Sequence, residues 1–140
     1  MKQTLLLFLL LFYSCNDDYT DNNTYLPNVQ VNFTINLNLP EGNDLLISGG
    51  HKIFYDRGIK GVIVFNNGLD NYIGFDLACP HINLQDCSTM TFEQSDLYLT
   101  CPCDEEQFSK LNGAPKNGEI QHAARRYIVS KNGNLLTVRN

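Results

Sequence analysis

The 140-residue sequence has no tryptophan, two methionines and no cluster of lysine or arginine. Its 15 acidic residues outnumber its 10 basic ones, so the formal net charge is −5. This balance argues against nucleic acid and anionic membrane surfaces as partners, because both select clustered positive charge. The sequence also has no phosphate-binding glycine loop and no EF-hand spacing, so nothing in it favours nucleotide or calcium chemistry.

The N-terminal region has one apolar run, Leu5 to Phe12, which is too short to cross a bilayer and is typical of a signal-peptide core. Ser14 then directly precedes Cys15, and this arrangement resembles the cleavage site of bacterial lipoproteins. The resemblance implies that residues 1–14 are removed and that Cys15 carries the lipid. It places the protein in the bacterial cell envelope as an outer-membrane lipoprotein, periplasmic or surface-exposed. The alternative is a soluble secreted protein with an ordinary signal.

Residues 15–27 are polar and acidic, with Asp17, Asp18 and Asp21 and few groups to bury. This composition predicts a flexible tether. An acidic run directly after the lipid cysteine resembles the surface-export signals of Bacteroidetes lipoproteins; the alternative is an ordinary solvated linker. The remaining residues, 28–140, have room for one domain.

The domain begins with strict alternation of apolar and polar residues from Val29 to Leu39, which predicts a half-buried strand. Turn residues follow at Pro40–Asn43. Further short apolar segments, with hairpin turns expected between them at 56–58 and 66–68, occupy residues 52–55, 61–65 and 71–78. No long helical period is present. Short strands at such intervals predict an all-β, antiparallel barrel or sandwich.

Four of the five cysteines lie in two short motifs and the segment between them, namely Cys79-Pro80-His81, Cys87 and Cys101-Pro102-Cys103-Asp104. A Cys-Pro-His followed by a Cys-Pro-Cys resembles the two loops that hold a Rieske [2Fe–2S] cluster, whose pattern is Cys-x-His and Cys-x-x-His. Cys79, His81 and Cys101 fill three of the four ligand positions. Asp104 stands in the fourth, where the family has histidine.

The resemblance covers about Val29 to Val138. It implies a Rieske-like fold of stacked antiparallel sheets with a small two-loop cluster-binding subdomain. It also implies that Cys79 and Cys101 bind one iron as thiolates, that His81 binds the other, and that Cys87 and Cys103 form a disulfide. The implied activity is one-electron transfer or redox sensing with an unidentified redox partner. The protein would then be an electron carrier and not itself a catalyst.

The substitution at Asp104 leaves two interpretations open. In the first, a [2Fe–2S] cluster binds with Asp104 as an oxygen ligand, since carboxylates do bind iron. In a variant of this interpretation Cys103 is the fourth ligand, or His122 reaches the site from the covering loop. In the second, the cluster is lost and Cys79 pairs with Cys101. The chain is then a disulfide-stapled, cluster-free surface module with a binding role.

Three further departures from the family pattern lie near the same site. Glu105 and Glu106 replace a Gly-Ser pair, and Glu119 replaces the proline of the loop that covers the cluster. A zinc site built from Cys79, His81, Cys101 and Cys103 has suitable donor types, but the paired loops and flanking strands fit the Rieske pattern better.

Overall fold

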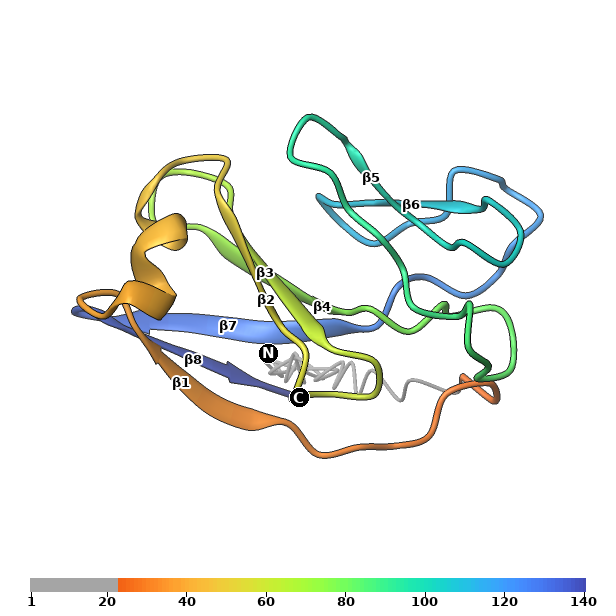
Figure 1. Ribbon diagram of the computed structural model, residues 1–140, viewed down its shortest axis with the longest axis horizontal. Coiled ribbons are helices and arrows are strands. Elements are labelled where there is room, and N and C mark those ends of the chain that lie inside the picture. Colours follow the sequence, from red (N-terminus) through yellow and green to blue (C-terminus); the bar gives the residue numbers. More distant parts are fainter. Residues whose placement is uncertain (1–22) are drawn as a thin grey trace, which may run out of the picture.

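A computed structural model describes residues 23–140. The expected signal peptide, Cys15 and the first part of the expected tether lie outside these residues. The described chain contains eight strands and one short 3-10 helix (Figure 1). In chain order these are β1 (Asn32–Asn36), η1 (Pro40–Leu46), β2 (His51–Phe54), β3 (Val62–Asn66), β4 (Tyr72–Asp76), β5 (Tyr98–Thr100), β6 (Gln107–Ser109), β7 (Arg126–Asn132) and β8 (Leu135–Arg139).

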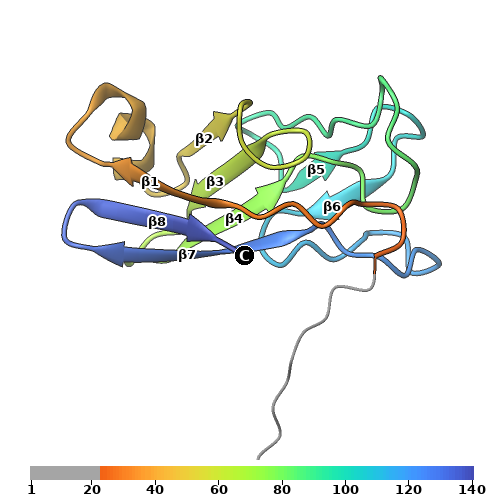
Figure 2. The same ribbon diagram turned by 90° about the horizontal axis from the view of Figure 1, so that it is seen from below.

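Six strands form one antiparallel sheet in the order β1-β8-β7-β4-β3-β2, and β5 and β6 form a separate two-stranded sheet. The large sheet curls, because its two edge strands meet: the rings of Phe33 in β1 and Phe54 in β2 lie 5.3 Å apart. Figures 1 and 2 show β5 and β6 beside one end of this curled sheet. The all-β class, the antiparallel sheets and the small subdomain expected from the sequence are confirmed.

β3 and β4 are the centre of the structure because every residue in both strands is buried. Val62 and Val64 face the interior of the curled sheet, where they pack with Ile35, Leu136 and other apolar residues. The alternate residues belong to a second cluster that includes both sheets, made of Ile63, Phe65, Ile73, Phe75, Leu77, Cys79, Met90, Leu99, Cys101, Phe108 and Ala124. The subdomain is therefore fixed to the outer face of the large sheet by apolar packing.

The alternation at the start of the domain has the expected consequence, since Val31, Ile35 and Leu37 are buried. Only Asn32–Asn36 pairs as a strand. The expected turn at Pro40–Asn43 is instead the start of η1, which Pro40 opens and which buries Leu45; proline suits a first helical position because its missing N–H would have no partner there.

The turn between β3 and β4 lies slightly later than the predicted Asn66–Gly68. Asn71 N donates to the Gly68 carbonyl, and Leu69 and Asp70 between them have φ of 51° and 59°. Positive φ at both central residues is the geometry of a type I′ hairpin turn. The sequence signal is hidden because Leu69 is an uncommon residue at such a position.

Part of the expected tether, residues 23–27, packs against the domain. Asn23 and Leu26 are buried, at 8% and 5% exposure, and Arg125 Nη1 donates to the Pro27 carbonyl. Residues 23–27 therefore belong to the folded domain. Among residues 23–140, no helix has the length and apolarity needed to cross a membrane.

A candidate metal centre at two adjoining loops

The first candidate loop follows β4 and begins with a buried carboxylate that sequence reasoning missed. Asp76 is 0% exposed, and its Oδ1 accepts a hydrogen bond from Ala78 N at 2.8 Å, directly before Cys79. Its Oδ2 accepts from Ile59 N at 2.7 Å and from Tyr127 Oη at 2.8 Å. Two separate segments, at Ile59 and Tyr127, are thus tied to the start of the loop. The only sequence signal was an acidic residue at the end of an apolar strand.

Gly58 explains how the chain approaches this carboxylate so closely. Its φ is 71°, and a Cβ placed there would lie 2.4 Å from Asp76 Oδ2. No side chain fits that space, so a residue other than glycine would displace the carboxylate.

The second candidate loop joins β5 to β6 and is closed by its own backbone. Glu105 N donates to the Cys101 carbonyl, and Cys101 N donates to the Glu106 carbonyl, both at 2.8 Å. Glu105 takes a φ of 63° to complete the turn, at the position where the Rieske pattern has glycine. Glu105 therefore has a backbone conformation that glycine adopts more readily than other residues.

Cys79 and Cys101 come together at the base of the two loops and form a disulfide with a Cα–Cα distance of 5.7 Å. Both are 0% exposed. In this structure the two sulfurs are therefore oxidised and are not thiolate ligands. The pairing of Cys79 with Cys101, which the second interpretation of the sequence predicted, is the one present. The physical reason is proximity, since two thiols at this separation can bond without backbone movement.

Cys87 and Cys103 form a second disulfide, with a Cα–Cα distance of 5.1 Å. This is the pairing that the family resemblance implies. It joins the two loops a second time, nearer the surface, and Gln85 Nε2 donates to Cys103 Sγ at 3.4 Å. Because Cys103 is bonded to Cys87, the variant in which Cys103 serves as the fourth ligand is not the arrangement present.

His81 and Asp104 face each other above the buried disulfide. His81 Nε2 and Asp104 Oδ2 lie 2.7 Å apart, with 12% and 35% of the side chains exposed. The His81 ring also packs against Phe108, with ring centroids 5.4 Å apart, and its Nδ1 is buried without a hydrogen-bond partner. One donor atom each from His81, Cys101 and Asp104 lie within 4.8 Å of one another.

The donor types fit an iron–sulfur centre under one chemical condition. An imidazole, a carboxylate and the sulfur of Cys101 converge, and Cys79 is bonded to that sulfur. The sulfurs can ligate only as thiolates, so Cys79 and Cys101 must first be reduced.

The remaining residues considered from the sequence lie away from this group. His122 contacts the ring of Tyr25, at a centroid distance of 5.5 Å, and is not among the converging donors. Glu119 is exposed, and its backbone N–H donates a hydrogen bond to Asn117 Oδ1. Asn117 Nδ2 in turn donates to Glu106 Oε1 at 3.1 Å, which links the covering loop to the second candidate loop.

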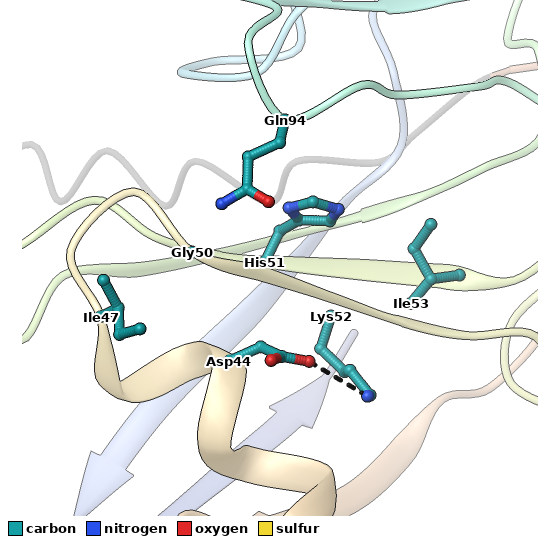
Figure 3. Close-up of a pocket in the computed structure, with 7 residues that line it drawn as sticks. All are labelled: Asp44, Ile47, Gly50, His51, Lys52, Ile53 and Gln94. Carbon is teal, nitrogen blue, oxygen red and sulfur yellow. Dashed lines mark hydrogen bonds and ion pairs between the residues drawn. The ribbon is translucent and has the colours of Figure 1, made fainter.

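A pocket of about 390 Å³ lies between η1 and β2 and contains none of the candidate ligands (Figure 3). Asp44 and Lys52 form an ion pair of 3.2 Å across it. His51 lies on the side of Gln94, and its ring packs against Phe92 at 4.9 Å. Burial lowers the pKa of His51, so its imidazole is neutral at neutral pH.

No protein-family profile matches the sequence, and no curated protein matches it significantly. The fold is similar to the ferredoxin of carbazole 1,9a-dioxygenase from Nocardioides aromaticivorans, with 23% identity over 79% of this chain and 97% of that chain, at a TM-score of 0.49. It is also similar to the plasma-membrane Rieske protein of the cyanobacterium Synechocystis PCC 6803, with 21% identity over 57% and 77% of the two chains, at 0.47. A further similarity is to Escherichia coli NirD, with 16% identity over 80% and 98%, at 0.44.

Proposed function

We propose that the chain is an exported, lipid-anchored electron-transfer or redox-sensing protein that binds a [2Fe–2S] cluster at the two adjoining loops. The observation that supports this most is the convergence of donors at the positions that the Rieske pattern assigns to ligands. His81 and Asp104 face each other at 2.7 Å, directly beside Cys101.

In the proposed site, Cys79 and Cys101 would hold one iron as thiolates after reduction of their disulfide, and His81 and Asp104 would hold the other. When bound, the cluster supplies a one-electron couple. Asp104 adds a negative charge where the family has a neutral imidazole, and this charge opposes the uptake of an electron. The reduction potential is therefore lower than that of a centre with two histidines.

The surrounding residues set the position of these donors. Asp76 fixes the start of the first loop through Ala78 N, and the Cys87–Cys103 disulfide limits how far the loops can separate. Phe108, which is fully buried, supports the ring of His81 from below. These contacts favour a rigid site, in which the positions of the donor atoms change little.

Reconstitution of reduced protein with iron and sulfide tests this assignment. Wild-type protein is expected to gain visible absorbance and about two irons per chain. His81→Ala and Cys101→Ala should fail to do so, while the matched control His122→Ala behaves as wild type. Equal iron binding by all four proteins would contradict the assignment.

A second candidate function is supported by the buried Cys79–Cys101 disulfide. In it the cluster is absent, both disulfides are permanent, and the chain is a stapled surface module that binds an unidentified partner. Protein purified from the native host would then be colourless, with no free thiol at Cys79, Cys87, Cys101 or Cys103.

Export and anchoring depend on the motif at Ser14 and Cys15. Acylation of one cysteine with several chains gives firm attachment, because each buried methylene contributes about 0.8 kcal/mol. We place the protein in the outer membrane of a bacterial envelope on this basis, with a redox partner in the same compartment.

A further inference from the structure

We propose that Asn23 is a positioning residue of the candidate site, which holds the loop of Cys79 and His81 in place from the N-terminal side. This role rests on the proposed function, because it concerns the loop that would carry two of the ligands. Its test uses the cluster-free protein, so the two proposals can fail separately.

The side-chain amide of Asn23 makes one long-range contact. Its Nδ2 donates to the Pro80 carbonyl at 2.7 Å, across 57 residues of sequence. That carbonyl belongs to the residue between Cys79 and His81, so the bond acts on the backbone that sets the spacing of these two donors. Both partners are buried, where a hydrogen bond is shielded from water and an unpaired carbonyl is costly.

The other end of the same amide is also used. Asn23 Oδ1 accepts from Tyr25 N at 2.9 Å, which closes a local turn. Leu26, at 5% exposure, anchors the segment beyond that turn. These contacts fix the orientation of the amide, so that its Nδ2 points toward the Pro80 carbonyl.

Proline at position 80 makes this contact more important. Pro80 has no N–H, so the loop has one backbone donor fewer with which to fix itself. The first loop is otherwise held at Cys79 N, which donates to the Ser88 carbonyl at 2.9 Å, and at Ala78 N by Asp76. Asn23 supplies the hydrogen bond to the stretch between the two candidate ligands.

The variant Asn23→Asp separates the two halves of the amide. A carboxylate keeps the oxygen that accepts from Tyr25 N, but it replaces the donor to Pro80 with an acceptor. Asn36→Asp is the matched control, because Asn36 Oδ1 makes the same kind of local turn to Asn38 N at 2.9 Å. Asn36 lies in β1 and takes no part in the candidate site.

The measurement is the initial rate at which dithiothreitol reduces each disulfide in the oxidised, cluster-free protein, followed by alkylation and peptide mapping. Each reduced disulfide takes two electrons and two protons from the dithiol, which becomes a cyclic disulfide. Because Cys79 and Cys101 are 0% exposed, their reduction requires local opening of the loops.

We expect Asn23→Asp to accelerate reduction of Cys79–Cys101 about tenfold, as loss of one buried hydrogen bond implies. The rate at Cys87–Cys103, whose Cys87 is already exposed, should change less than twofold. Asn36→Asp should leave both rates unchanged. If Asn23→Asp does not fold, Asn23→Ser is measured instead, since its hydroxyl can accept from Tyr25 N but is too short to reach Pro80.

An unchanged rate at Cys79–Cys101 in the folded Asn23 variant would overturn the proposal. Equal acceleration of both disulfides would overturn it too, because it would show general loosening of the domain and no specific hold on this loop.

Discussion

Replacement of Asp76 by asparagine tests whether the buried carboxylate organises the first candidate loop. The carboxylate accepts from Ile59 N and Tyr127 Oη at one oxygen, and from Ala78 N and Lys60 N at the other. An amide of the same shape offers one oxygen, so two of these four donors lose their acceptor in either orientation.

The expected loss follows from that count. A hydrogen bond to a charged group contributes about 1.5–3 kcal/mol, and an unpaired buried donor carries its desolvation cost as well. Loss of two bonds should therefore lower the free energy of unfolding by about 3–6 kcal/mol. This is a large share of the total of about 5–15 kcal/mol that is typical of a domain.

Urea unfolding of the purified protein, with both disulfides intact, gives the free energy directly from the midpoint and slope. Asp70→Asn is the matched control, because Asp70 pairs with Lys131 at the surface and its side chain is 70% exposed. We expect that control to leave stability nearly unchanged. A loss below about 1 kcal/mol for Asp76→Asn would refute the role given to this carboxylate.

Four further predictions concern single residues. Asp104→His should raise the reduction potential of the loaded protein and make it depend more strongly on pH, because a second imidazole then joins His81 at the iron, as measured by redox titration between pH 6 and pH 10. Cys15→Ser should release the protein from the membrane fraction after cell lysis, since the lipid has no attachment point. Glu105→Gly should raise the free energy of unfolding by about 1 kcal/mol, because glycine removes the Cβ clash at a φ of 63°. His51→Phe should flatten the dependence of stability on pH: burial lowers the pKa of His51, so the unfolded chain binds more protons and wild-type stability falls as the pH drops below about 6.5.

Each of these has an outcome that counts against it. Potentials of Asp104→His that match wild type at every pH would show that Asp104 does not bind iron. Continued membrane attachment of Cys15→Ser would rule out the lipid anchor. Glu106→Gly is the control for Glu105→Gly and should destabilise, since Glu106 does not have positive φ; stabilisation by both would remove the strain argument. A His51→Phe protein with unchanged pH dependence would assign the titration to another group.

The strands and the two loops were predictable from local sequence because each depends on a short pattern. Alternation set the buried face of β1, and the continuous apolar run at Val62–Phe65 matches a strand that is buried on both faces. The Cys-Pro motifs placed the candidate donors, and His81, Cys101 and Asp104 do converge.

Three of the missed features depend on contacts that no local pattern shows. Asn23 reads as part of a polar tether until Pro80 is seen beside it, and Asp76 reads as the polar end of a strand until its partners at Ile59 and Tyr127 are known. The curl of the large sheet depends on β1 meeting β2, although four strands lie between them in the order of the sheet. No local pattern encodes such contacts, so sequence periodicity could not have shown them.

The sequence also did not decide whether Cys79 and Cys101 are thiolates or form a disulfide. The same placement of the two sulfurs serves both states, and the redox history of the chain decides which one is populated.

Analysis of iron and acid-labile sulfide in protein made by its native host, and purified without air, tests the central claim most directly. The account predicts about two of each per chain, together with a brown colour that is lost when Cys79 or Cys101 is replaced. Colourless protein without iron or sulfide, whose mass shows both disulfides formed, would contradict it.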